Sequence, residues 1–185
     1  MRSSVFCALL GGAGSLSCTT YMPSVAPSQR PTGKEAIVYG RFEVTGSPPF
    51  APDVAHSSMA LVMRCEDGRE YRIRFDGEQP IVVLAAAPST CWLDELLYLD
   101  AANTTLSKTT LPDELRQPMS LAAGRAYYLG DFRGNITFEF SDTFRERFQV
   151  KDWRHEFTAT TQDFRAQFPK LRGLAPVDPL TPARE

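Results

Sequence analysis

The fold class is decided by residues 59–75, Met-Ala-Leu-Val-Met-Arg-Cys-Glu-Asp-Gly-Arg-Glu-Tyr-Arg-Ile-Arg-Phe. Two runs with strand composition, 59–65 and 69–75, flank Glu-Asp-Gly, and Asp67-Gly68 can adopt the positive φ angles that a tight hairpin requires. In the second run apolar and charged residues alternate, which is the two-residue period of a strand with one buried face. The expected inward residues are Tyr71, Ile73 and Phe75, and the expected outward residues are Arg72 and Arg74. The stretch therefore predicts an antiparallel β-hairpin.

Segments on both sides of this hairpin have strand patterns as well. Residues 35–44 alternate and predict a half-buried strand, with Tyr39 on its exposed face. Residues 81–86 are apolar throughout, which is typical of a strand covered on both faces. Residues 92–100 fit either a helix or a strand, and we favour the strand because the neighbouring segments are strands.

The second half of the chain has shorter signals. Residues 103–118 have the composition of a loop. After them, turns that contain glycine separate apolar runs that are too short to be helices. The expected strands lie near residues 119–121, 127–130, 136–140 and 148–153.

One helix is expected, near residues 158–168. Its apolar face repeats at helical spacing, Thr160 is the expected N-cap, and Pro169 ends the run. Short strands followed by a single helix predict a mainly β protein, an antiparallel β-sandwich with one C-terminal α-helix.

The two ends of the chain differ in composition from this domain. Residues 1–17 carry Arg2 as their only charge, then an apolar run and small residues, which is the outline of a secretory signal peptide. Residues 18–34 are rich in proline, serine and threonine and predict a flexible tether, the alternative being an ordered segment packed on the edge of the domain. We expect the β-sandwich domain over residues 35–172 and a Pro-rich tail without regular structure over residues 173–185.

Two short stretches carry a resemblance to known proteins. Residues 11–18, Gly-Gly-Ala-Gly-Ser-Leu-Ser-Cys, resemble the lipobox of bacterial lipoproteins, in which small residues precede a cysteine that is acylated and becomes the mature N-terminus. Residues 123–132, Ala-Gly-Arg-Ala-Tyr-Tyr-Leu-Gly-Asp-Phe, are similar to a recurring feature of small, largely uncharacterised envelope lipoproteins with immunoglobulin-like or transthyretin-like β-sandwiches. The resemblance implies a lipid such as palmitate on Cys18 and, because Thr19 follows, attachment to the outer membrane facing the periplasm. Ser15 and Ser17 also fit an ordinary signal peptidase site, which would leave a secreted or soluble periplasmic protein.

The cysteine count agrees with acylation. Of the four cysteines, Cys7 leaves with the signal peptide and Cys18 takes the lipid, so Cys65 and Cys91 remain as a pair in an oxidising compartment. We expect a disulfide between them, the alternative being two separate buried thiols.

Candidate catalytic groups are few. Neither of the two histidines, His56 and His155, lies in a recognisable catalytic motif. A pair of His155 with Asp152 would make the protein a small periplasmic hydrolase, which is the rival hypothesis. Asp94 and Glu95 are adjacent, so on a regular strand they would point to opposite faces. The sequence contains no spacing typical of a metal or cofactor site, and we expect neither.

Arginines are the enriched polar residues. Arg64, Arg72 and Arg74 gather around the hairpin and are the tentative ligand or partner surface, although carboxylates interleave them. With 20 basic and 22 acidic residues, we do not expect nucleic acid as a partner. The sequence as a whole predicts a lipid-anchored, non-enzymatic binding or assembly module for another envelope component. The alternatives are the hydrolase that uses His155 and Asp152, or a binder of anionic glycan through the arginines.

Overall fold

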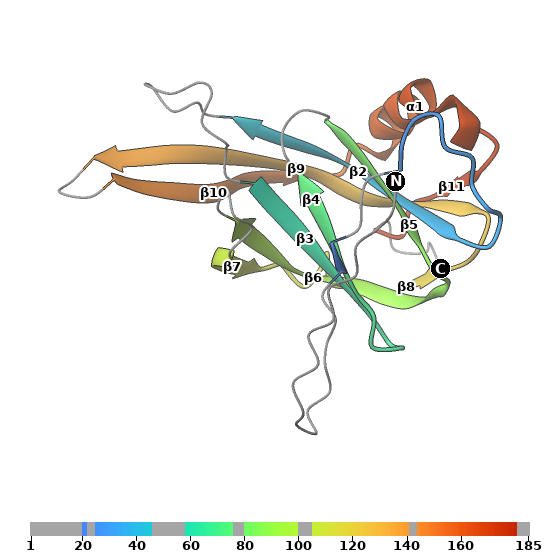
Figure 1. Cartoon of the computed structure of the whole chain (residues 1–185), viewed down its shortest axis with the longest axis horizontal. Coiled ribbons are helices and arrows are strands. Elements are labelled where there is room, and N and C mark those ends of the chain that lie inside the picture. Colours follow the sequence, from blue (N-terminus) through green and yellow to red (C-terminus); the bar gives the residue numbers. More distant parts are fainter. Residues whose placement is uncertain are drawn as a thin grey trace.

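The computed structural model describes residues 20–21, 25–45, 58–75, 80–99, 105–140 and 144–180. They form two β-sheets that face each other, with one helix and a short 3₁₀ turn on the outside (Figure 1). The first sheet has the order β1-β4-β3-β6-β7, and β8 also pairs with β6. The second has the order β10-β9-β2-β5, and β11 also pairs with β9. The mainly β sandwich with a helix near the C-terminus is therefore confirmed.

The strands of the first sheet are β1 (Thr20–Tyr21), β3 (Ser58–Cys65), β4 (Glu70–Phe75), β6 (Ser89–Leu99), β7 (Thr105–Thr110) and β8 (Met119–Leu121). The strands of the second are β2 (Ala36–Thr45), β5 (Ile81–Ala86), β9 (Arg125–Phe140), β10 (Phe144–Arg154) and β11 (Ala175–Val177). The helix α1 spans Phe157–Gln167 and the 3₁₀ turn η1 spans Pro169–Leu171. Most neighbouring strands pair antiparallel, but β1 with β4, β2 with β9 and β11 with β9 pair parallel.

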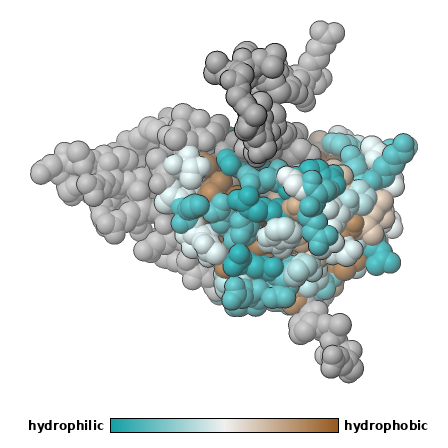
Figure 2. All heavy atoms as spheres, turned by 90° about the horizontal axis from the view of Figure 1, so that it is seen from below, coloured by the Kyte–Doolittle hydropathy of each residue, from teal (hydrophilic) through white to brown (hydrophobic). Residues whose placement is uncertain are grey.

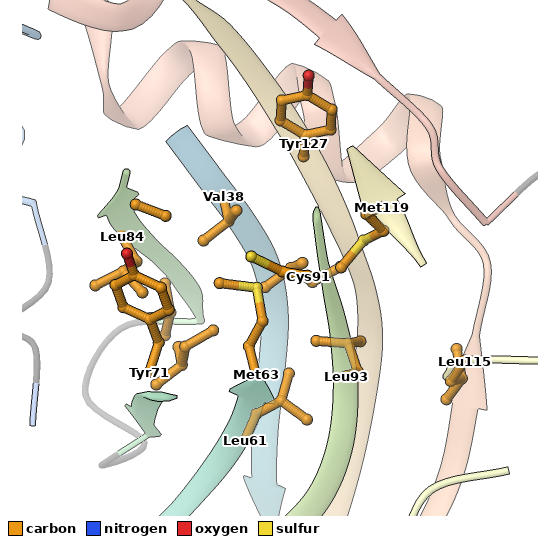
Figure 3. Packing of buried hydrophobic residues seen from close by; sticks show 14 of the residues in the cluster. Val38, Leu61, Met63, Tyr71, Leu84, Cys91, Leu93, Leu115, Met119 and Tyr127 are labelled. Atoms are coloured by element: carbon orange, nitrogen blue, oxygen red, sulfur yellow. The ribbon is translucent and has the colours of Figure 1, made fainter. Parts of the chain in front are cut away.

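The main core lies between the two sheets (Figure 3). Inward residues of β3 and β6, such as Leu61 and Leu93, meet Val38 and Leu84 from the second sheet. The hairpin prediction is confirmed: β3 and β4 pair antiparallel, Gly68 has a positive φ, and Tyr71 and Ile73 are buried. The strand over residues 92–100 is confirmed too, as part of β6.

A second core lies on the other face of the second sheet, under α1. Phe164 and Phe168 pack there against residues of β2, β5 and β9, and Phe164 stacks on Tyr39. The prediction that β2 is only half buried is therefore wrong, because the helix covers its other face and Tyr39 is fully buried. The prediction that β5 is covered on both faces is confirmed.

Three further predictions about elements are wrong. Residues 105–110 form β7 because a threonine-rich run fits a strand beside β6. The strands expected near 127–130 and 136–140 are one strand, β9, which passes Gly130 without a turn. Thr160 is not the N-cap, since α1 begins after Glu156 and Thr160 lies buried inside the helix.

Both predicted flexible ends contain ordered residues. β1 pairs with β4, and the buried Val25 donates its backbone N–H to the carbonyl oxygen of Val83 at 2.7 Å, so the tether over residues 18–34 is wrong for these positions. β11 pairs with β9, so the tail after residue 173 has regular structure as well. In both cases pairing with a neighbouring strand outweighs the poor local propensity.

The disulfide between Cys65 and Cys91 is present and joins the directly opposite residues of β3 and β6. It lies at the end of the first sheet where the β3–β4 hairpin turns. Cys7, Cys18 and His56 lie outside the described residues.

Candidate functional site

The outer face of the first sheet carries a group of charged side chains that contact one another. We call it the charged face; its residues are Arg64, Glu70, Arg72, Asp94, Glu95, Lys108 and Arg116. They come from β3, β4, β6, β7 and the segment before β8. Figure 2 views the molecule from below, the side on which β6, β7 and β8 lie in Figure 1, and hydrophilic residues dominate the coloured part of that view.

A β-bulge in β6 makes this arrangement. Val62 lies opposite Glu95 and Met63 lies opposite Leu93, so Asp94 is an extra residue in the ladder. Leu93 and Leu96 face the core, while Asp94 and Glu95 both contact Arg64. The expectation that the two carboxylates point to opposite faces is wrong, because a regular two-residue alternation does not hold across a bulge.

Arg64 is the hub of the charged face. Its Nε lies 2.6 Å from an Asp94 oxygen, its Nη1 3.0 Å from Glu70 and its Nη2 3.4 Å from Glu95. The hydrogen bond to Asp94 raises the pKa of Arg64 above its ordinary value. The Arg64 side chain is 42% exposed, whereas its three carboxylate partners are 14–20% exposed, so the network lies at the surface with its acidic members partly buried. Ion pairs at a protein surface each contribute about 0 to 1 kcal/mol to stability.

The three arginines singled out from the sequence do lie on one face. Arg64 is on β3, and Arg72 and Arg74 are on the neighbouring β4, opposite Val62 and Ala60. Arg72 donates to Glu70 at 3.0 Å, whereas Arg74 is exposed. The face therefore mixes both signs of charge.

The residues that sequence reasoning missed come from segments distant in the chain. Arg116 lies 3.4 Å from Asp94, and Lys108, whose side chain is 70% exposed, lies 3.4 Å from Glu95. Sequence reasoning placed both in a loop. It also missed a small buried apolar cluster whose residues alternate with core residues along β3 and β6. Its members are Ala60, Val62, Leu97 and Leu99.

The second sheet holds a different polar site, under the N-terminus of α1. We call it the buried polar cluster; its residues are Arg41, Tyr128, Asp131, Glu156 and Thr160. A bulge makes this site too, since Tyr39 pairs with Tyr128 but Arg41 pairs with Asp131. Gly130 has φ +110°, and a Cβ there would lie 2.5 Å from Nε1 of Trp153. Glycine at this position therefore allows the bulge that turns Asp131 toward the helix.

Asp131 is only 5% exposed and its carboxylate is well supplied with donors. The Tyr128 hydroxyl donates to it, the Thr160 hydroxyl donates at 2.6 Å and the Glu156 backbone N–H at 3.2 Å. Arg41 Nε lies 3.4 Å away and its guanidinium also contacts Asp163. Burial, helped by the hydrogen bond to Asp131, raises the pKa of Tyr128. This cluster holds the start of the helix on the sheet.

His155, the residue after β10, is paired with Asp178. Its Nε2 lies 2.8 Å from an Asp178 oxygen, and its ring lies edge-on to Tyr128. Asp178 follows β11, so this contact joins the C-terminal segment to the start of α1. The side chain of Asp152, the partner expected from the sequence, lies outside the described side chains, so the pairing with His155 stays a prediction.

The described residues contain no group of three or more histidine, cysteine or acidic side chains arranged to hold a metal ion. Within the same ranges no helix is both long and apolar enough to cross a membrane.

Comparison with known proteins gives no relative: neither a protein-family model nor a curated protein sequence matches this chain.

Proposed function

We propose that this chain is a lipid-anchored protein of the bacterial cell envelope that binds another envelope protein through its charged face. The observation that carries the proposal is the network around Arg64 on one sheet face. In it, Arg64 and Lys108, which are 42% and 70% exposed, contact carboxylates that are 14–20% exposed. Such charges contribute little to stability, but they give a protein partner complementary groups to pair with, which sets specificity and the rate of association.

A protein partner fits this face better than an anionic glycan does. Arg64 already contacts three carboxylates and Arg72 contacts Glu70, so anionic sugars would compete with carboxylates held in place by the sheet. A protein can offer both signs of charge. It can therefore pair with Lys108 and with the carboxylates at the same time.

The contacts of His155 favour a structural role for that residue over the hydrolase hypothesis. Its bond to Asp178 holds the segment after β11, and the neighbouring Tyr128 is committed to Asp131 and to the backbone of Glu156. We therefore assign His155 the role of joining the C-terminal segment to the start of α1, and the hydrolase that uses His155 and Asp152 stays the alternative.

The anchor is tested by the intact mass of the protein purified from envelopes. We expect a chain that begins at Cys18 and carries acyl mass, and that gains two hydrogens on reduction. An unacylated chain would contradict the anchor, and the Cys18→Ser variant, which cannot be acylated by the lipoprotein route, is the control.

The binding face is tested by photocrosslinking in intact cells. A photoreactive amino acid replaces Lys108 on the charged face or, as a matched control, the exposed Gln162 on α1. We expect a discrete protein adduct from position 108 only, lost when Glu95→Lys is added. Equal adducts from both positions, or none from position 108, would contradict this face as the binding site.

A further inference from the structure

The position of β1 fixes where the anchor joins the folded domain. β1 begins at Thr20, two residues after Cys18, and two residues of extended chain span at most about 7 Å. After β1, Val25 is fixed again on β5 through its backbone hydrogen bond to Val83. A lipid on Cys18 would therefore hold the domain close to the membrane, without the reach that a free tether gives.

The pairing of β1 also indicates which end of the first sheet lies closest to Cys18. β1 runs parallel to β4, with Thr20 opposite Tyr71 and Tyr21 opposite Arg72. The chain must therefore arrive from the end of the sheet where β4 begins. The β3–β4 turn lies at that end, and its exposed residues are Glu66, Asp67 and Gly68.

This end of the sheet is reinforced by several contacts. The disulfide of Cys65 and Cys91 lies there, and the Glu66 backbone N–H donates to Thr90 at 2.9 Å. Arg69 pairs with Asp67 and donates to the Pro88 carbonyl oxygen at 3.2 Å, which joins the β3–β4 turn to the turn before β6. We call this region, residues 65–69 and 87–90, the anchor end.

We propose that the anchor end rests on the phospholipid headgroups of the membrane that holds the acylated Cys18. The proposal depends on the lipid anchor proposed above. Two observations carry it: the two-residue distance from Cys18 to β1 and the parallel register of β1 with β4. The exposed turn at the anchor end is polar, with Glu66 and Asp67 balanced in part by Arg69, and the disulfide crosslinks β3 and β6 there. The strands then run away from the membrane and leave the charged face open to a partner alongside.

The test uses the full acylated protein in vesicles of phosphatidylethanolamine and phosphatidylglycerol. A fluorophore is attached through a clickable amino acid at position 66, in the anchor end, or at position 162, on α1 across the other sheet. The vesicles contain a lipid with a quencher on its headgroup. We expect quenching at position 66 to exceed that at position 162 several-fold.

An insertion sharpens the test. Twelve Gly and Ser residues between Thr19 and Thr20 add a flexible linker with an end-to-end distance of about 20 Å. We expect the insertion to leave vesicle binding unchanged and to abolish the difference between the two positions.

Each outcome assigns the failure to one proposal. If the acylated protein binds vesicles but both positions are quenched equally, or position 162 more, docking through the anchor end is wrong and the lipid anchor stands. If mass spectrometry finds no acyl group on the envelope protein, the anchor itself is wrong and docking falls with it. Retained preference for position 66 in the insertion variant would overturn the argument from linker length.

Discussion

Each of the two sheets contains a bulge that turns a carboxylate away from the core, and the two carboxylates have different surroundings. In the second sheet the bulge at Gly130 places Asp131 under α1, where it is buried and bound by hydroxyl and backbone donors. In the first sheet the bulge at Asp94 places Glu95 on the outer face, where Arg64 and Lys108 contact it near solvent. The comparison teaches that burial decides the role: the buried cluster stabilises the fold, whereas the charged face, which keeps contact with solvent, is the surface that we propose for recognition.

The largest expected effect on stability comes from a substitution in the buried polar cluster. Asp131→Ala removes the acceptor for Tyr128 and Thr160 and leaves their hydroxyls buried without it. We expect the free energy of unfolding to fall by about 3–5 kcal/mol, as for other broken buried pairs. Urea denaturation measures it. Asp163→Ala is the control, because Asp163 contacts the same Arg41 but is 49% exposed, and it should cost about 1 kcal/mol or less. Equal losses would contradict the role of burial.

The next largest effect is expected from the disulfide, which we expect to stabilise the first sheet more than its surface charges do. Replacing both Cys65 and Cys91 by alanine opens a crosslink between residues 26 apart, which in the chain-entropy model stabilises by about 3–4 kcal/mol. We expect the free energy of unfolding of the double variant to be lower by that amount. Reductant should lower the free energy of unfolding of the unmodified protein by a similar amount in the same urea titration. If reductant changes neither mass nor stability, the disulfide is not formed in the protein.

A smaller effect depends on pH and concerns the second sheet. Burial raises the pKa of Tyr39 to about 12. In the unfolded chain the Tyr39 hydroxyl ionises near pH 10. Its contribution to the free energy of unfolding is therefore complete below pH 10 and is lost as the pH rises toward 12, a loss of about 2 to 3 kcal/mol. We expect Tyr39→Phe to reduce this loss between pH 9 and pH 11.5 in urea denaturation, with Tyr128 contributing the remainder. An unchanged pH dependence in the variant would mean that burial does not raise the pKa of Tyr39.

The smallest effect on stability is expected at the hub of the charged face. Arg64→Met keeps the aliphatic stem and removes three ion pairs. Arg64 is 42% exposed but its partners Glu70, Asp94 and Glu95 are only 14–20% exposed, so we expect a loss of about 1–2 kcal/mol. The same variant should lose the crosslinked adduct from position 108. A variant that unfolds, or that binds as well as the unmodified chain, would place Arg64 among the structural residues.

Sequence reasoning succeeded where the signal is local. The β3–β4 hairpin follows from alternation around Asp67-Gly68, and the strand β5 follows from its unbroken apolar run. Both patterns lie within a few residues of chain, so no knowledge of distant partners is needed. The disulfide followed from the cysteine count together with the expected compartment.

Sequence reasoning failed where distant segments decide. The buried polar cluster combines β2, β9 and the start of α1, and alternation alone would place Asp131 in the main core. Gly130 was the available signal, but a glycine in a strand pattern was interpreted as a turn when it marks a bulge. β1 and β11 are held by pairing with strands far along the chain, which their proline-rich surroundings conceal.

The central claim is that the charged face is the side used for binding, and carboxyl footprinting tests it most directly. Exposed carboxylates are labelled with a carbodiimide and an amine, in intact envelopes and in the purified protein, and each site is quantified by mass spectrometry. Our account predicts that labelling of Asp94, Glu95 and the neighbouring Asp113 falls in envelopes, while labelling of Glu156 and Asp163 beside α1 is unchanged. Equal labelling of the charged face in both samples, or protection beside α1 alone, would contradict it.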